Sequence, residues 1–359
     1  MPDIKFPKFY EPFADNFFEQ YQLENEVTCP SEKVHGLKNK KLRTCKFCGK
    51  SFPQTTFKKD AHIIPEALGN RYMVSDFECD NCNEIFGHYE NELVKYLGIS
   101  RTITKTKTKS KIPNYNRPHI KASIEKFFNT DSIIIESKTE DFKVFDYNPE
   151  TNERIIRSIK APYVPIKVFK ALMKMGLCLV NNGDLKNYNL ALKFLKTNIY
   201  DTNIKMPLYL STFILPSMYE KPFGILFKRN SIDFETPTHV FVLFYKSYQF
   251  QICLPFNNQD ENLMHVNCPI LPPVFDGLGN ENFKYLNHYF KNLNDGEVVK
   301  GEEEFINFKI DQGSLKNVVA FDPKTKIFSD AKLEEREIKK IIIIDKNLKL
   351  SLDDLSKLK

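Results

Sequence analysis

The chain has 359 residues, of which 42% are hydrophobic and 27% charged, and a formal net charge of +6 at pH 7. This length predicts two or three domains with ordinary hydrophobic cores. The sequence contains no run of 18 apolar residues and no signal-peptide pattern at its start, which argues against a membrane span or secretion and favours the cytoplasm. The modest positive charge permits a polyanionic partner without requiring one.

Two Cys-x-x-Cys pairs stand out in the N-terminal third of the chain, Cys45/Cys48 and Cys79/Cys82. Two knuckles of this spacing supply the four thiolates that a tetrahedral structural Zn²⁺ needs. Gly49 follows the first pair and suits the positive φ of a knuckle turn. We therefore predict a structural zinc site. The other four cysteines are scattered and are expected to be free thiols or core residues: Cys29, Cys178, Cys253 and Cys268.

The chain between the two pairs and just after the second predicts four elements in order. They are a strand over 55–64, a turn at Gly69-Asn70, a strand over 72–77 and a helix over 83–97 with Asp80 as its N-cap. His62 stands near the end of the first predicted strand, and Asn83 stands at the start of the predicted helix. The pattern thus predicts a strand–strand–helix unit with an imidazole and an amide between two zinc knuckles.

These features resemble the HNH endonuclease family, whose core is a ββα-metal finger. Three pieces match: the first Cys-x-x-Cys, the stretch AHIIPEALGN that contains His62, and ECDNCN at the helix start. The resemblance implies that His62 is the general base that activates water. It also implies that Asn83 is a ligand of a catalytic metal ion.

The sequence departs from the family at one position. The acid that usually precedes the catalytic histidine and binds the metal is replaced by Ala61. Two carboxylates offer alternatives: Asp60 would share a face of the strand with His62, and Glu90 would share a face of the helix with Asn83. Both remain open at this point, and we slightly favour Glu90, because related sequences often carry an acid near that position.

Residue chemistry agrees with phosphodiester hydrolysis. An imidazole has a pKa suited to a general base near neutral pH. A divalent cation stabilises the negative charge of the phosphate and the leaving oxygen. Amide and carboxylate oxygens prefer hard ions, so the expected catalytic metal is Mg²⁺ or Mn²⁺.

An acid-free basic segment, 101–118, follows the predicted helix. In an extended strand, alternate lysines would project from one face about 7 Å apart, and phosphates along a nucleic-acid strand have a spacing of the same order. We therefore predict that this segment tracks a phosphate backbone. The predicted nucleic-acid-binding residues are Arg101, Lys105, Lys107, Lys109 and Lys111.

The remaining part of the chain contains no catalytic motif and mixes strands and helices without a βαβ rhythm, so the predicted fold class is α+β. The predicted elements are strands over 132–137, 142–147, 153–160, 223–227, 239–245, 248–254 and 339–344, an amphipathic helix over 165–180, a helix over 184–197, and helix alternating with loop over 280–304. The predicted organisation is an N-terminal arm (1–44), the finger (45–98), a basic strand or linker (99–118) and an accessory domain (119–359) that positions substrate, senses a trigger or oligomerises.

Two functions compete at this stage. The first is a metal-dependent endonuclease acting on DNA, with RNA not excluded, and serving as a phage-defence or restriction effector. The second is a catalytically inactive, zinc-stabilised nucleic-acid-binding or adaptor protein, which Ala61 favours. A homo-oligomer or an effector partner bound through the accessory domain is compatible with either function, and no membrane partner is expected.

Overall fold

The computed structural model describes residues 6, 8–32, 39–109, 111–127, 130–148, 153–197, 208–233, 235–263, 267–274, 286–309, 319–322, 327–330 and 340–343. Their contacts divide the chain into two compact units. The first unit comprises 1–96, 107–109 and 163–299, and the second comprises 97–106, 110–162 and 300–359. The predicted boundaries at 44, 98 and 118 do not coincide with this division, because the finger lies in the same unit as much of the predicted accessory domain.

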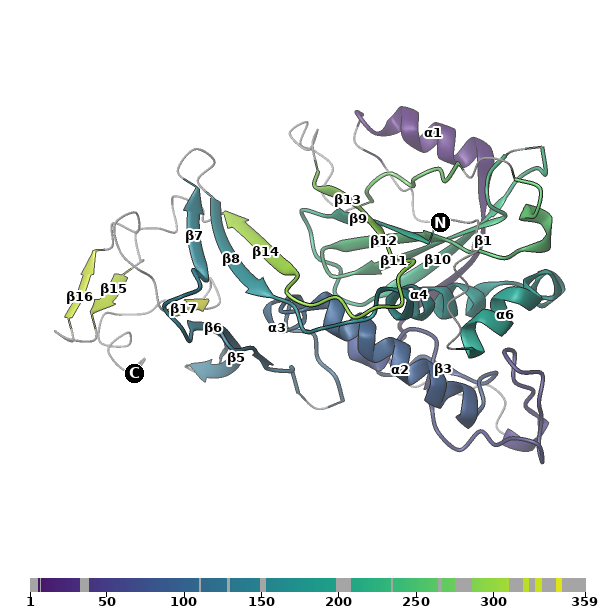
Figure 1. Cartoon of the computed structure of the whole chain (residues 1–359), viewed down its shortest axis with the longest axis horizontal. Helices are drawn as coiled ribbons and strands as arrows, with labels where there is room; N and C mark the ends of the chain where they lie inside the picture. The colour runs from purple at the N-terminus through teal and green to yellow at the C-terminus, as the bar shows by residue number, and fades with distance from the viewer. Residues whose placement is uncertain are drawn as a thin grey trace. The chain divides into compact units, whose positions relative to one another are not determined.

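An antiparallel six-stranded sheet organises the first unit (Figure 1). In spatial order its strands are β1 (Tyr21–Thr28), β10 (Phe223–Arg229), β11 (His239–Tyr245), β12 (Tyr248–Cys253), β9 (Tyr209–Ile214) and β13 (His288–Asn292). Strand β11 is buried along its whole length, as a near-continuous apolar run predicts for a strand covered on both faces. Its alternate residues Val240 and Val242 belong to a core that also includes Phe17 of helix α1 (Glu11–Gln20).

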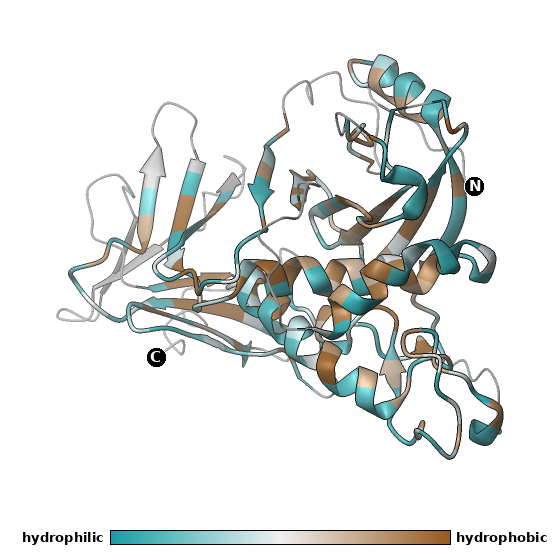
Figure 2. Cartoon of the chain, turned by 45° about the vertical axis from the view of Figure 1, so that its right-hand side comes forward, coloured by the Kyte–Doolittle hydropathy of each residue, from teal (hydrophilic) through white to brown (hydrophobic). Residues whose placement is uncertain are grey.

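Helix α4 (Pro165–Leu179) packs on strands β1, β10 and β11. The approach is close at Gly176, where a Cβ atom would lie 2.7 Å from a methyl of Leu254 and 3.0 Å from Cβ of Phe241. Sequence periodicity predicted an amphipathic helix, but α4 is buried on all sides, including Lys170 and Lys174. Hydrophobic residues accordingly gather in the strands of the sheet and in the helices packed against them (Figure 2).

The zinc-knuckle segment forms the expected strand–strand–helix unit. Strands β2 (Ala61–His62) and β3 (Val74–Ser75) pair antiparallel, with His62 opposite Val74, and helix α2 spans Asp80–Leu97. Both strands are shorter than predicted, because the turn η2 (Glu66–Leu68) and its flanking loops take up most of the intervening chain. A further turn, η1 (Lys40–Leu42), precedes the first knuckle.

The second unit is built from smaller antiparallel sheets. One sheet has the order β17 (Lys340–Ile343), β6 (Thr130–Ser137), β5 (Ile120–Phe127) and β4 (Tyr115–Asn116), and another has β14 (Glu303–Lys309), β8 (Glu153–Ile159) and β7 (Phe145–Asn148). Strands β15 (Val319–Asp322) and β16 (Ile327–Asp330) form a separate pair, and helix α3 (Ser100–Ile103) precedes β4. Ile120, Ile135 and Ile156 share one apolar core.

The α+β class is confirmed, while three further predicted elements differ. The helix predicted over 184–197 is divided into α5 (Asn182–Leu185), the turn η3 (Lys186–Tyr188) and α6 (Asn189–Lys196). The helical character predicted over 280–304 is wrong for the described part, which contains β13 and the start of β14, because pairing with β9 and β8 outweighs local propensity. The basic segment 105–111 forms no strand among its described residues.

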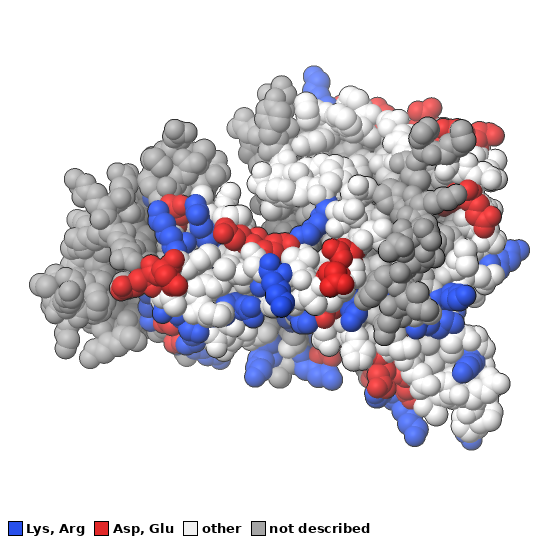
Figure 3. Space-filling model, viewed as in Figure 1, with Lys and Arg blue, Asp and Glu red and all other residues white. Residues whose placement is uncertain are grey.

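The described residues include no helix that is both long and apolar enough to cross a membrane. On the face seen in Figure 3, acidic and basic side chains of described residues are interspersed, so the net positive charge is not gathered into one patch there. Local clusters of charge are therefore more informative than the total charge.

Candidate functional site

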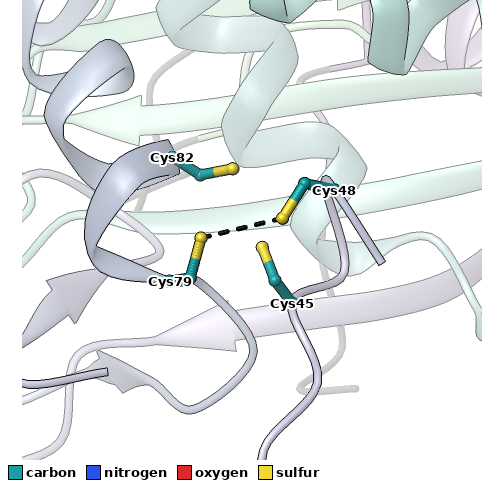
Figure 4. Close-up of side chains that lie close together, drawn as sticks. All are labelled: Cys45, Cys48, Cys79 and Cys82. Atoms are coloured by element: carbon teal, nitrogen blue, oxygen red, sulfur yellow. Dashed lines mark hydrogen bonds between the residues drawn. The ribbon is translucent and has the colours of Figure 1, made fainter. Parts of the chain in front are cut away.

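The four cysteine sulfurs converge on one point (Figure 4). Cys45 and Cys48 come from the first knuckle, Cys79 directly precedes α2 and Cys82 lies in its first turn. All four Sγ atoms lie within 4.8 Å of one another. The Sγ atoms of Cys48 and Cys79 are 3.7 Å apart. A tetrahedral Zn²⁺ with Zn–S bonds of about 2.3 Å would separate its sulfurs by about 3.8 Å. The cluster therefore fits a structural zinc ion.

The backbone of the first knuckle holds these thiols in place. The Gly49 N–H donates to the Cys45 carbonyl at 2.8 Å, and Gly49 adopts the expected positive φ of 70°. The Cys82 thiol donates a hydrogen bond to Cys45, which lowers the pKa of the Cys45 thiol to about 4 and raises the pKa of the Cys82 thiol. One thiolate forms easily here, but several thiolates at this distance require a cation between them.

Asp80 links helix α2 to the chain that leads into β2. Its carboxylate accepts hydrogen bonds from the backbone N–H groups of Lys58 and Lys59 at 2.9 and 2.8 Å and from the Thr56 hydroxyl at 2.5 Å. These bonds lower the pKa of Asp80 although burial opposes them. Asp80, predicted as the N-cap, is thus the first residue of α2, and its carboxylate binds the chain over 56–59 that leads into β2.

His62 is half-buried, and its ring orientation is set by the backbone. Nδ1 lies 3.1 Å from the Met73 carbonyl, so the neutral imidazole carries its proton on Nδ1 and donates it to that oxygen. Among the described residues none hydrogen-bonds to Nε2, and the side chain lines a pocket. Burial lowers the pKa of His62, against the opposing effects of Glu66 and of Glu90. The imidazole is therefore neutral at pH 7, with Nε2 ready to accept a proton.

Asn70 shapes the loop between β2 and β3, and sequence reasoning missed this role. Its side chain is fully buried, makes four hydrogen bonds to backbone groups, and also brings Nδ2 within 3.5 Å of Nδ1 of His62. Nδ2 donates to the carbonyls of Ile64 and Met73 at 2.6 and 3.0 Å, and Oδ1 accepts from the N–H groups of Tyr72 and Met73 at 3.3 and 2.9 Å. Asn70 thus fixes the carbonyl that orients His62. The sequence signal was the Gly-Asn pair, which was interpreted only as a turn.

A pocket of about 630 Å³ brings several predicted residues together. Its ionisable and amide side chains are Lys59, Asp60, His62, Glu66, Arg71, Asn83 and Lys109. The pocket therefore combines an imidazole, an amide, two carboxylates and three cations. Oxygen donors of this kind suit Mg²⁺ or Mn²⁺, and the cations suit a phosphate.

Glu90 has a different environment. It does not line the pocket, and its carboxylate lies 3.3 Å from Nζ of Lys174 in helix α4. Ala61, at the position of the missing acid, is buried and pairs with Ser75 across the two short strands. Of the two carboxylates that remained open, Asp60 is the one that shares a pocket with His62 and Asn83.

The lysines of the basic segment fall into two groups. Lys107 and Lys109 belong to the first unit and are exposed, and the carbonyl of Thr108 between them accepts a hydrogen bond from Arg71 at 2.9 Å. Lys109 also lies 3.7 Å from Glu66, in a largely solvated ion pair. Arg101, Lys105 and Lys111 belong to the second unit; Lys105 donates to the Asp131 carbonyl there.

A second group of ligand-type residues, Glu24, Asp184 and His239, also lies within 4.8 Å. Each already has a partner: His239 contacts Glu24 at 2.6 Å and the Tyr188 hydroxyl at 2.8 Å, and Lys228 donates to Asp184 at 2.5 Å. The Lys228 ammonium supplies the positive charge that these carboxylates need. We therefore assign this group to a buried hydrogen-bond network of the sheet.

Comparison with known proteins gives one match. Residues 45–95 match the model of a family described as HNH endonuclease. No curated protein and no solved structure is significantly similar to the chain. The match covers both zinc knuckles, the short strands and most of α2, and it therefore covers most of the pocket described above.

Proposed function

We propose that this chain, whose residues 45–95 match the HNH endonuclease family, is a metal-dependent endonuclease that hydrolyses phosphodiester bonds in DNA. One observation carries this proposal: His62, with Nε2 directed to no described partner, shares a single pocket with the oxygen donors Asp60 and Asn83 and with three cations. General bases, hard-metal ligands and phosphate-binding cations are the three components that this reaction needs.

In this proposal Nε2 of His62 accepts a proton from the attacking water. The hydrogen bond from Nδ1 to the Met73 carbonyl keeps the ring in the tautomer that leaves Nε2 unprotonated, and it stabilises the imidazolium that forms. Lys59, Arg71 and Lys109 would hold the phosphate in the pocket, with Arg71 able to bind two phosphate oxygens at once.

The donor set also fits a catalytic Mg²⁺ or Mn²⁺. Asp60 and Asn83 would hold the ion, and we now favour Asp60 over Glu90 because only Asp60 lines the pocket. Such an ion stabilises the charge of the scissile phosphate and of the leaving oxygen. The four-cysteine cluster would keep its own zinc ion and take no part in the chemistry.

A second function, a binding protein without activity, has one observation in its favour. Ala61 stands where the family usually has a metal-binding acid, and its buried methyl side chain has no atom that could bind a metal ion. If Asp60 does not bind the metal, the pocket would hold a phosphate without cleaving it.

Cleavage assays separate these functions. Supercoiled plasmid, single-stranded DNA and RNA are each incubated with the protein in Mg²⁺, Mn²⁺ or EDTA, beside the variants Asp60→Asn and Glu90→Gln. We expect metal-dependent cleavage of DNA that Asp60→Asn abolishes, whereas Glu90→Gln keeps substantial activity. Binding without cleavage under every condition would support the adaptor, and preferential cleavage of RNA would change the substrate class.

A role as a cytoplasmic restriction or phage-defence effector extends the same proposal. Its support is the combination of a nuclease finger with a much larger accessory region. The test is the efficiency of phage plating on cells that express the protein or its Asp60→Asn variant. Equal plating on both would remove the defence role and leave the nuclease proposal intact.

A further inference from the structure

Lys174 of helix α4 contacts the finger at three places. Its Nζ donates to the carbonyl of His62 at 2.5 Å and lies 3.1 Å from the carboxylate of Glu78 and 3.3 Å from that of Glu90. His62 ends β2, Glu78 directly precedes the second knuckle, and Glu90 lies in α2. One ammonium from a helix about a hundred residues downstream therefore joins three parts of the finger.

The ammonium of Lys174 is fully buried. Burial alone would lower its pKa, but the carboxylates of Glu78 and Glu90 raise the pKa of Lys174 above its ordinary value. A buried charge is retained only where its partners are fixed around it. The cation is therefore held in one position, and so is the carbonyl to which it donates.

Both ends of α4 are also bound by residues of the finger. The carboxylate of Glu92 accepts a hydrogen bond at 2.9 Å from the N–H of Val164, which precedes the first turn. Nζ of Lys46 donates to the carbonyls of Cys178 and Val180 at 2.8 and 2.5 Å. A carboxylate at the N-terminus and an ammonium at the C-terminus complement the helix dipole. Helix α4 is thus bound to the finger at both of its ends and at Lys174.

The catalytic strand needs such external support. Strand β2 has two residues and pairs only with the two residues of β3. A ladder this short fixes its backbone weakly. The bond from His62 Nδ1 to Met73 orients the ring, but it does not fix the backbone of His62 relative to α2 and Asn83. The carbonyl of His62 is fixed instead by Lys174.

We propose that Lys174 is a positioning residue for His62, and that helix α4 of the downstream region is thereby part of the nuclease site. This inference rests on the proposed function. It assigns to the downstream chain a role that the family match over residues 45–95 does not include.

The test compares two lysines of the same helix. Lys174→Met removes the ammonium and keeps most of the side-chain length. Lys170→Met is the matched control, because Lys170 is equally buried but donates to the Thr197 carbonyl at 2.6 Å and lies over the ring of Phe194. Both variants remove a buried cation from α4, and only the first removes the bond to His62.

We expect Lys174→Met to lower kcat by about 100-fold with KM changed by less than about threefold, since small misplacements of a catalytic group have effects of this size. Lys170→Met should keep kcat within about threefold of the wild type. Lys174→Arg, which restores a cationic donor, should recover part of kcat. Equal losses of kcat in Lys174→Met and Lys170→Met would overturn the proposal.

A further variant separates positioning from stability. Lys174→Met combined with Glu78→Gln and Glu90→Gln removes all three charges together, so no uncompensated carboxylate remains buried. We expect this triple variant to bind one equivalent of zinc and to melt close to the wild type, yet to keep the low kcat of Lys174→Met. Recovery of wild-type kcat in the triple variant would show that only stability was affected and would overturn the proposal.

Histidine NMR gives a readout that does not depend on cleavage. In protein labelled with ¹⁵N-histidine, His62 is assigned by the loss of its signals in His62→Gln. We expect the His62 ring shifts to change in Lys174→Met and to stay in place in Lys170→Met. Unchanged His62 shifts in Lys174→Met would contradict the proposal. If the wild type never cleaves DNA, the proposed function fails, and this comparison still decides whether Lys174 positions His62.

Discussion

His62 and Asn70 illustrate how single residues of the finger depend on their neighbours. The imidazole is oriented by one backbone carbonyl, that of Met73, and the same carbonyl is held by the buried amide of Asn70. Because the amide nitrogen and the amide oxygen of Asn70 both bond to backbone groups, Asn70 determines the path of the loop from Ile64 to Met73. The loop is therefore as important to the proposed base as the strand on which the base lies.

Asn70→Ala should destabilise the protein and impair the site. Alanine leaves backbone groups of Ile64 and Met73 without their buried partner, which should cost about 3 kcal/mol of unfolding free energy. Urea unfolding monitored by circular dichroism measures this loss. Asn182→Ala, at an exposed position of α5, is the control and should change stability by less than about 0.5 kcal/mol. Equal stability of both variants would contradict the assigned role of Asn70.

The pH dependence of cleavage should report on His62. A general base works only in its neutral form, so activity is lost as the pH falls through its pKa. Burial lowers the pKa of His62 from 6.5, and Glu66 and Glu90 only partly oppose this effect. We therefore expect the acidic limb of kcat/KM to have its midpoint below pH 6.5. A midpoint clearly above pH 6.5 would show that a different group, or a differently placed His62, controls the rate.

At the scale of elements, α4 is the helix on which both the sheet and the finger pack. Gly176→Ala tests the sheet side, because the added methyl would meet Leu254 and Phe241 within 3.0 Å. We expect a loss of about 2 kcal/mol in unfolding free energy from this overpacking. Gly183→Ala in α5 has open space around it and should be neutral or slightly stabilising. If Gly176→Ala and Gly183→Ala had the same free energy of unfolding, that result would argue against the close packing of α4.

The exposed segment 107–109 is the part of the basic run that reaches the pocket. Lys107→Gln with Lys109→Gln should weaken DNA binding and reduce the slope of log Kd against log salt by up to about 2, because each lost phosphate contact removes about 0.9. Lys193→Gln with Lys196→Gln on α6 removes the same charge from another exposed surface of the unit. If both pairs of substitutions reduced the slope equally, DNA binding would depend only on the total charge of the protein, which would contradict phosphate contacts by Lys107 and Lys109.

Elements with strong local signals were predictable from the sequence. The knuckles, the ββα order of the finger and strands such as β11 follow from spacing and apolar runs. The burial of Lys170 and Lys174 was not predictable, because a lysine on a helix is normally solvated and its partners are distant in the sequence. Of the residues that line the pocket, Asp60, His62, Asn83 and Lys109 were named from the sequence, whereas Lys59, Glu66 and Arg71 were not. The preference for Asp60 over Glu90 depended on tertiary contacts.

At the scale of the whole molecule, the zinc cluster is expected to stabilise the finger by linking its first loop to α2. Cys82→Ser should reduce bound zinc from about one equivalent to near zero and should speed amide exchange across the finger. Metal analysis and hydrogen exchange measure both effects. Cys268→Ser, outside the cluster, should keep zinc and protection. A Cys82→Ser protein that retains zinc would remove the assignment.

The finger is not separate from the downstream chain, as the predicted domain boundaries had it. It lies in one compact unit with the six-stranded sheet. Lys46 and Glu92 of the finger contact the ends of α4, and Lys174 of α4 contacts His62 of the finger. Strand β1, within the predicted N-terminal arm, forms the edge of that sheet. We therefore expect a fragment of residues 45–98 alone to be a poor nuclease even when loaded with zinc.

The rate of plasmid cleavage under single-turnover conditions tests the central claim most directly. It compares the wild type with His62→Ala and with His88→Ala, whose histidine is exposed on the same helix as Asn83, at equal zinc content. The pocket chemistry predicts that His62→Ala slows cleavage by about 100-fold or more and that His88→Ala does not. Cleavage by His62→Ala at the wild-type rate would contradict the account.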